Sequence, residues 1–302
     1  MSGIRSLVSA AFGWFYHPVL HRWRHKEEYK MLRPILNDSL SRMRAMRIRL
    51  PEFPAACSVA GRTAVQIHVF YTDLLAEFYG HLKGIEVPYD LYISTDTQEK
   101  KHTIEDFFSN HVLSARKIVV EVFANRGRDV YPFLEQMHDR VFDYSYVAHF
   151  HTKKSVYIKE GDAWRQALLK KLLGDGGRFN RIIFFLSTNA SYGLVIHDIP
   201  GQPVLKWGYA ATKNDQWNQD SVKKEYSSFG FDSEKFDLRE YEHSAGTMFI
   251  ARVKSVRQVF EKKYLPSDFP EERGQLKHTL QHTLELVWHP VCAGNGYKLG
   301  VV

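Results

Sequence analysis

The sequence predicts an α/β protein built on an open, mostly parallel β-sheet flanked by helices. From residue 64 onward, short apolar runs alternate with amphipathic stretches of about 10 to 15 residues. The apolar runs predict buried strands, and the stretches between them predict helices that cross over from one parallel strand to the next. Two polar clusters directly follow two of the apolar runs, where a parallel sheet builds its ligand site.

The first half of the domain is expected to contain four strands. Apolar runs predict them at 64–71, 90–95, 117–123 and 146–150. Residues 73–83 predict a helix capped near Thr72 or Asp73, and residues 98–111 predict a second helix. A third helix is expected to open near Tyr131 and Pro132, because proline is favoured at an early helical position.

The second half is less regular. Helices are expected at 163–173 and 178–186, and strands at 194–197 and 246–252, the latter entered through Gly246. A last helix is expected at 276–288, ending before Pro290. The polar segment 206–236 between them predicts loop and short helix, and a long irregular segment of this kind is where an acceptor site is expected.

The positive charge of the chain is concentrated at its start. Residues 1–50 hold ten Lys and Arg against three acidic residues, a net charge of +7, which equals the net charge of all 302 residues. The remaining 252 residues are balanced, with 31 basic and 31 acidic side chains. We therefore divide the chain into a basic amphipathic appendage, 1–60, and a catalytic domain, 61–302.

The appendage begins with an apolar, aromatic stretch that is too short to span a bilayer, which takes about 20 apolar residues. Trp14, Phe15 and Tyr16 suit the headgroup level of a membrane, and the basic residues at 21–26 suit anionic lipid. The alternative is a helix packed on the domain with a solvated basic face. Cys57 and Cys292 have no metal-ligand or redox spacing, so a reducing cytoplasm is the expected compartment.

The first polar cluster is Asn125, Arg126, Gly127, Arg128 and Asp129, after the strand at 117–123. Gly127 allows a positive-φ turn or a close backbone approach to a ligand. The two arginines suit either phosphate or Asp129, which itself suits a sugar or ribose hydroxyl. The alternative to a binding site is an internal salt bridge between arginine and Asp129 that orders the turn.

The second polar cluster is His149, His151, Thr152, Lys153, Lys154 and Ser155, at the end of the strand at 146–150. Together the clusters bring a surplus of cation to one edge of the sheet, which predicts a phosphorylated substrate. Because His149 and His151 share a strand face, a shared transition metal is the competing hypothesis. The neighbouring lysines repel a cation, so we expect no metal.

Both clusters, together with Trp164 and the glycine-led stretch from Gly246, resemble the rhamnan synthesis protein F family of bacterial polysaccharide-assembly enzymes. The resemblance covers roughly residues 60–300. It implies a glycosyltransferase of the GT-A type that transfers rhamnose from dTDP-rhamnose to a lipid-linked cell-surface glycan. The implied location is peripheral, at the cytoplasmic face of the membrane, with anionic lipid and a polysaccharide-assembly complex as partners.

Common GT-A enzymes hold a divalent metal on an Asp-x-Asp at a strand end, since such metals prefer oxygen ligands. Here the corresponding strand end carries His149, His151 and Lys153 without a carboxylate. Lysine neutralises a diphosphate as a point charge, so Lys153, Lys154 or both are expected to replace the metal. We predict transfer without a metal and without any cofactor beyond the nucleotide-sugar donor.

Three further residues are candidates for substrate contacts. Asp96 ends the second strand, where nucleotide-sugar enzymes often place a carboxylate on the base or ribose; a helix-capping role for Asp96 or Thr95 is the alternative. Trp164 is a candidate for stacking on a sugar ring, with a buried helical role as its alternative. Gly246 would let a sugar approach the strand that follows.

The catalytic base is expected near the C-terminus. An inverting transfer needs a carboxylate or histidine that takes the proton of the acceptor hydroxyl. The family's His-x-x-Glu-Arg-like stretch matches His282 and Glu285, with Leu286 where arginine is usual. His282 and Glu285 share a helical face, and Glu242 with His243 is the alternative pair.

Two other function classes fit parts of the sequence. A nucleic-acid-binding protein would explain the pI near 9.2 and the arginine-rich stretch at 43–50. The neutral body argues against it, so no nucleic acid is expected as a partner. A phosphohydrolase with histidine-bound metal would use His149 and His151, but the sequence lacks a carboxylate-rich metal constellation.

Overall fold

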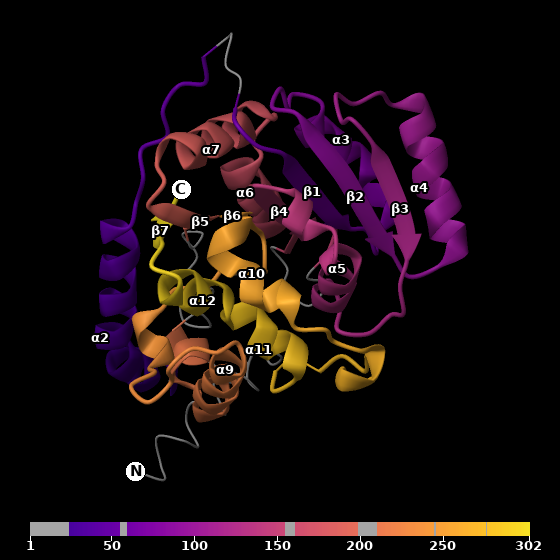
Figure 1. Cartoon of the computed structure of the whole chain (residues 1–302). Coiled ribbons are helices and arrows are strands. Elements are labelled where there is room, and N and C mark those ends of the chain that lie inside the picture. The colour runs from indigo at the N-terminus through magenta and orange to yellow at the C-terminus, as the bar shows by residue number, and fades with distance from the viewer. Residues whose placement is uncertain (1–23, 55–58, 155–160, 199–209, 245, 276) are drawn as a thin grey trace.

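The computed structural model (Figure 1) describes residues 24–54, 59–154, 161–198, 210–244, 246–275 and 277–302. Within them, seven strands form one sheet in the order β3-β2-β1-β4-β6-β5-β7. The strands are β1 (Thr63–His68), β2 (Tyr89–Thr95), β3 (Ile118–Val122), β4 (Tyr146–His151), β5 (Tyr192–Ile196), β6 (Phe249–Arg252) and β7 (Lys298–Val301). The expected open, mostly parallel sheet is confirmed.

The direction of each strand decides which strand ends meet at one edge of the sheet. β1 pairs in parallel with β2 and β4, and β2 pairs in parallel with β3. β6 is antiparallel to both β4 and β5, whereas β7 is parallel to β5. The carboxyl ends of β1 to β5 therefore share an edge with the turn that leads into β6.

Helices cover both faces of the sheet, and each face has its own apolar core. α3 (Leu75–Leu82), α4 (Gln98–Asn110), α6 (Gly161–Leu172) and α7 (Gly177–Thr188) pack on one face. α5 (Val130–Met137), α9 (Gln216–Ser228), α10 (Val253–Glu261), α11 (Leu280–Leu286) and α12 (Trp288–Gly294) pack on the other. Apolar side chains of the strands alternate between the two cores, which is the period of 2 that a pleated strand imposes.

The predicted elements up to β5 are present, with two differences in the helix caps. α4 is capped by Thr97, whose hydroxyl accepts a hydrogen bond from the backbone N–H of Lys100 at 3.2 Å. The capping role considered for Asp96 or Thr95 is wrong: Asp96 pairs with the Lys100 ammonium at 2.6 Å, and the Thr95 hydroxyl bonds to the Val69 carbonyl. The helix expected from Asp73 opens as a 3-10 turn (Thr72–Leu74) without a side-chain cap.

Three predicted elements of the second half differ from the structure. β6 begins at Phe249 rather than 246, because Gly246 and Thr247 have φ angles of +81° and +58° and form a turn. The helix predicted at 276–288 is instead two short helices, α11 and α12. Pro290 lies in the first turn of α12, where its missing N–H breaks no helical bond.

The third difference is α9, a regular helix of 13 residues inside the segment predicted as loop and short helix. Its cap is Asp215, whose carboxylate accepts a hydrogen bond from the backbone N–H of Asn218 at 3.2 Å. Val222 and Tyr226 on its inner face join the apolar core. Long-range packing stabilises this helix, although its composition is polar.

The N-terminal appendage is described from α2 (Arg24–Ala45) onward, and its end packs on the domain. Met43 and Leu50 are buried, and the backbone N–H of Ile48 donates to the carbonyl of Val301 on β7. Figure 1 shows α2 beside this edge of the sheet. Of residues 1–26, to which the membrane-surface hypothesis applies, 1–23 lie outside the described residues. Among the described helices, none is both long and apolar enough to traverse a bilayer.

A close approach of two glycines generates a stability prediction. A Cβ on Gly176, whose φ is +95°, would lie 2.1 Å from the backbone carbon of Gly84. Gly176→Ala should therefore lower the free energy of unfolding by about 3 kcal/mol. Gly80→Ala is the control: it lies inside α3 with open space at its Cβ, so alanine should raise stability by about 1 kcal/mol. Equal changes in the free energy of unfolding of the two variants, measured by urea denaturation, would contradict the close approach.

Candidate active site

The polar residues at the ends of β1, β2 and β4 lie side by side. In register, Gln66 of β1 stands beside His149 of β4, and His68 stands between Ser94 and His151. All five side chains are buried. Polar groups buried in the centre of a sheet need hydrogen-bond partners inside the protein, so their partners define the site.

The His151 ring is held at both nitrogens. Its Nε2 lies 2.5 Å from the carbonyl oxygen of Gly246, and its Nδ1 accepts the backbone N–H of Lys153 at 3.1 Å. These partners require a neutral ring protonated at Nε2. Burial lowers the pKa of His151 to about 4, in agreement with this state.

His149 faces Asp129 across the floor of the site. Its Nε2 lies 3.4 Å from Oδ2 of Asp129, and its Nδ1 lies 2.7 Å from Oε1 of Gln66. Burial alone would raise the pKa of Asp129, but His151, His149 and Lys153 together hold it below its usual range. Asp129 is therefore a buried carboxylate whose charge depends on its histidine and lysine neighbours.

The turn that carries Asp129 has an unusual backbone. Gly127 and Arg128 both adopt left-handed conformations, with φ of 62° and 56°. A Cβ on Gly127 would lie 2.6 Å from the Phe269 ring and 2.7 Å from Cβ of Tyr131, so only glycine fits. The turn thus places Asp129 directly before the first residue of α5.

The arginines of this turn bind the segment before α11, and the internal salt bridge considered for them is wrong. Arg126 donates to the carbonyl of Phe269 at 3.0 Å and lies 3.4 Å from Glu271. Arg128 donates to the carbonyl of Gln275 and lies 3.5 Å from Glu272. Asp129 pairs instead with His149, because the left-handed Arg128 points its side chain away from it.

α11 brings His282 and Glu285 to the same place. His282 Nε2 accepts from Nη1 of Arg128 at 3.3 Å, and its Nδ1 contacts the Thr279 hydroxyl at 2.7 Å. Burial and the charge of Arg128 lower the pKa of His282 to about 3, so this ring is neutral and its basic nitrogen is occupied. Burial raises the pKa of Glu285, opposed by Lys153 and Arg128 and reinforced by Asp129.

The two adjacent lysines diverge. Lys154 forms an ion pair with Asp73 and lies 5.0 Å from the centre of the Tyr71 ring. The charge of Lys153 acts on the pKa values of Asp129, His282 and Glu285. Of the two lysines, Lys153 is therefore the one whose charge reaches the polar residues at the strand ends.

The remaining candidates lie farther from this group. Asn125 is exposed, and Asp96 is paired with Lys100 at the end of β2. Trp164 borders the site through Gly246, where a Cβ would lie 3.9 Å from the indole ring, and most of its surface packs on the core of that face. Ser155 lies outside the described residues.

The alternative candidates for the catalytic base, Glu242 and His243, have a different environment. Glu242 forms a buried ion pair with Lys213 at 3.2 Å, and its backbone N–H donates to Nδ1 of His289 at 2.8 Å. Burial, Lys213 and His197 lower the pKa of His243 to about 3. The structure does not bring these residues to Lys153.

Several residues of the site were not among the sequence candidates. They are Gln66, His68, Ser94, Gln136, Glu272 and Thr279, which hold the candidate residues by hydrogen bonds or charge. The one available signal was Gln66 and His68 at alternate positions of an otherwise apolar strand, because a buried polar pair on one strand face requires partners.

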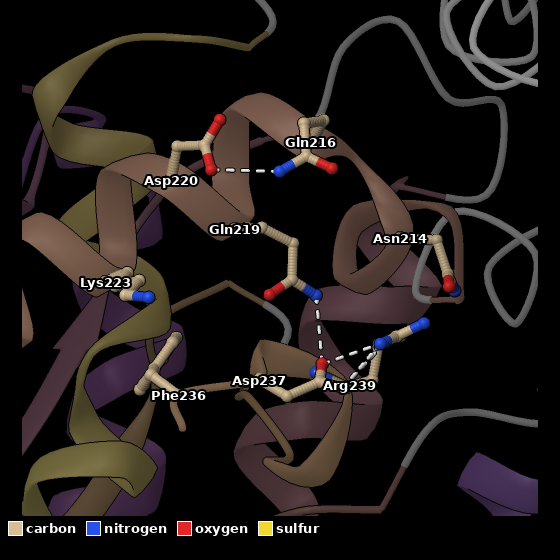
Figure 2. Close-up of a pocket in the computed structure, with 8 residues that line it drawn as sticks. All are labelled: Asn214, Gln216, Gln219, Asp220, Lys223, Phe236, Asp237 and Arg239. Carbon is tan, nitrogen blue, oxygen red and sulfur yellow. Dashed lines mark hydrogen bonds and ion pairs between the residues drawn. The ribbon is translucent and has the colours of Figure 1, made fainter. Parts of the chain in front are cut away.

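A separate polar cavity of about 300 Å³ opens beside α9 (Figure 2). Its charged side chains balance, two acidic and two basic, and both carboxylate oxygens of Asp237 accept from Arg239, Oδ1 at 2.8 Å and Oδ2 at 2.6 Å. It is lined by Asn214, Gln216, Gln219, Asp220, Lys223, Phe236, Asp237 and Arg239. This cavity falls in the 206–236 segment expected to face the acceptor.

The strand-end residues do not fit the metal site of common GT-A enzymes. Asp129 faces His149, and both ring nitrogens of His149 and of His151 have protein partners. Among the described residues, no three His, Cys, Asp or Glu side chains are grouped so as to hold an ion.

Comparison with known proteins shows which family the chain belongs to. The family model described as rhamnan synthesis protein F matches residues 45–297. The chain belongs to the rhamnan synthesis protein F family. The uncharacterized protein WxcX of two Xanthomonas campestris pv. campestris strains is 29% identical over 287 residues, which is 94% of this chain. The chain spans 39% of the length of these curated relatives.

Two solved structures show a more distant likeness. A mannosyltransferase from Pyrobaculum calidifontis, in complex with GDP-Man and Mn²⁺, aligns with a TM-score of 0.45 and 11% identity, over 99% of this chain and 66% of that one. The mannosyltransferase Ktr4p from S. cerevisiae aligns with a TM-score of 0.34 and 8% identity, over 97% of this chain and 78% of that one. At these values neither likeness identifies a donor or a metal for this rhamnan synthesis protein F member.

The contact between Arg128 and His282 generates a titration prediction. In Arg128→Met, the pKa of His282 should rise from about 3 toward 6.5, because a nearby cation and a donor to Nε2 are both removed. NMR titration of the imidazole measures this change. Arg126→Met is the matched control, since Arg126 shares the turn but contacts Phe269 and Glu271. The same shift in both variants would contradict the contact.

Proposed function

We propose that this domain is a glycosyltransferase that transfers rhamnose from dTDP-rhamnose to a lipid-linked cell-surface glycan at the cytoplasmic face of the membrane. The family's description, rhamnan synthesis, supports rhamnose as the sugar. A nucleotide sugar carries a diphosphate, which suits the cationic strand ends. The proposal concerns this chain alone, because the curated relatives are much longer.

The position of Lys153 carries the proposal. Its neighbour Lys154 is paired with Asp73, whereas the charge of Lys153 acts on Asp129, His282 and Glu285 at the carboxyl edge of the sheet. A lysine ammonium at this position can stabilise the diphosphate leaving group as its negative charge develops. We therefore assign to Lys153 the role that a metal has in common GT-A enzymes.

Glu285 is our candidate for the catalytic base. A base that works near neutral pH needs a pKa above that of an ordinary carboxylate, and burial raises the pKa of Glu285. In the transfer, Glu285 takes the acceptor hydroxyl proton while the oxygen bonds to the anomeric carbon. The bond from that carbon to the diphosphate breaks, and the nucleoside diphosphate leaves beside Lys153.

A donor panel tests the function and the role of Lys153 together. We expect release of nucleoside diphosphate with dTDP-rhamnose and a fall in kcat/KM of about 10²- to 10³-fold in Lys153→Ala. Lys154→Ala is the control and should stay within about threefold of the wild type, because Lys154 faces Asp73. No release with any nucleotide sugar would overturn the function, and loss of activity with a chelator would overturn the metal-free assignment.

The Glu285 assignment predicts both a rate and a pH dependence. Glu285→Gln should lower kcat by about 10²- to 10⁴-fold, because an amide accepts no proton. The base acts when ionised, so wild-type activity should fall as the pH drops through the raised pKa of Glu285, above the usual value of about 4.3. Glu271→Gln removes an equivalent charge at an exposed position and should change neither kcat nor the pH dependence of activity. An acid limb at the ordinary carboxylate pKa would argue against Glu285.

A further inference from the structure

A continuous line of hydrogen bonds crosses the buried sheet and ends at Asp129. It begins at Glu121 of β3, which forms an ion pair with Arg140. Gln136 of α5 contacts Glu121 at 3.1 Å, and Gln66 contacts Gln136 at 3.0 Å. Gln66 then contacts Nδ1 of His149 at 2.7 Å, and Nε2 of His149 faces Asp129 at 3.4 Å.

The donors and acceptors of this line follow from its first member. One terminal atom of Gln136 faces the Glu121 carboxylate and, at 3.1 Å, the Ile93 carbonyl. Both are acceptors, so this atom is the amide nitrogen and the other is the oxygen. That oxygen must receive an N–H from Gln66, which turns the Gln66 oxygen toward His149.

The orientation of Gln66 determines the protonation of His149. Because an amide oxygen only accepts, Nδ1 of His149 must carry a proton. Its Nε2 then faces a carboxylate oxygen of Asp129, and two lone pairs would oppose each other unless a proton lies between them. We propose that Gln66 and Gln136 are positioning residues that hold His149 as the Nδ1-protonated ring, so that His149 and Asp129 share one further proton and form a pair without net charge.

The surroundings of His149 act on this state in both directions. The Phe133 ring stacks on the imidazole with centroids 4.1 Å apart and planes 11° from parallel, an arrangement that attracts a cationic ring. Burial lowers the pKa of His149 and so opposes the charged ring, and the hydrogen bond and charge of Asp129 partly offset this effect. The other titratable groups facing this pair are His68 of β1, His151 of β4 and Lys153, with Glu285 on the far side of Asp129.

The consequence for substrate binding rests on the proposed function. A bare Asp129 carboxylate would repel a diphosphate and would cancel part of the Lys153 charge. When the shared proton neutralises Asp129, the positive charge of Lys153 is left for the donor. Loss of this line of hydrogen bonds should therefore weaken donor binding more than it slows the chemical step.

The test is NMR of the full chain labelled with ¹⁵N-histidine, because the long-range ¹H–¹⁵N pattern reports each ring's tautomer. In the wild type at pH 7, His149 should carry protons on Nδ1 and, shared with Asp129, on Nε2. In Asp129→Asn the amide leaves no charge to neutralise, so Nε2 should lose its proton while Nδ1 keeps one. In Gln66→Met the acceptor for Nδ1 is gone, so His149 should change to the Nε2-protonated ring.

Ser94→Ala is the matched control, because Ser94 contacts the same Gln66 nitrogen at 2.9 Å without setting its orientation. Its His149 spectrum should match the wild type. With dTDP-rhamnose, Gln66→Met should raise KM about tenfold and leave kcat within about threefold. A wild-type His149 that is neutral with its proton on Nε2, or an unchanged tautomer in Gln66→Met, would overturn the proposal. The NMR spectra need no substrate, so they test the protonation of His149 even if no nucleotide sugar proves to be a donor.

Discussion

The parallel register of β1 between β2 and β4 is the constraint on which the site depends. It sets Gln66 beside His149 and His68 beside both Ser94 and His151, all in strands whose two faces are covered by helices. A slip of one residue would turn every side chain of β1 to the other face and leave its buried amide and imidazole without partners. Each unpaired buried polar group costs about 1 to 3 kcal/mol, so the apolar pattern and the polar line specify the same register.

Backbone strain gathers at the three turns that surround these strand ends. Among the described residues, three other than glycine adopt a positive φ: Arg128, Thr247 and His278. They come from the turn before α5, the turn into β6 and the segment before α11. Such conformations cost about 1 to 3 kcal/mol each and persist where surrounding contacts hold them. Arg128 bonds to the segment before α11, and His278 of that segment contacts the Asp215 carboxylate at 3.0 Å, so long-range contacts hold two of these three turns.

Sequence patterns predicted the first half of the fold well because its elements repeat a short buried strand and an amphipathic helix. They failed for α9, whose polar composition hides a helix stabilised by packing, and for the turn at Gly246 and Thr247, where a glycine-led apolar run resembles a strand. The strand-end clusters were recognisable, since polar residues after apolar runs meet at one edge. The partners of Arg126 and Arg128 were not, because a pairing across some 145 residues leaves no local pattern.

Asp129 and Glu285 show how one small volume holds two carboxylates with different tasks. Each acts on the other's charge, and both lie near Lys153, yet their pKa values move apart: histidine and lysine neighbours lower that of Asp129, whereas burial raises that of Glu285. Two carboxyl groups whose pKa values diverge are suited to separate roles. Asp129 stays paired with His149, whose hydrogen bond and charge favour the ionised carboxylate. Glu285 is then the carboxyl group better suited to take a proton, because burial raises its pKa.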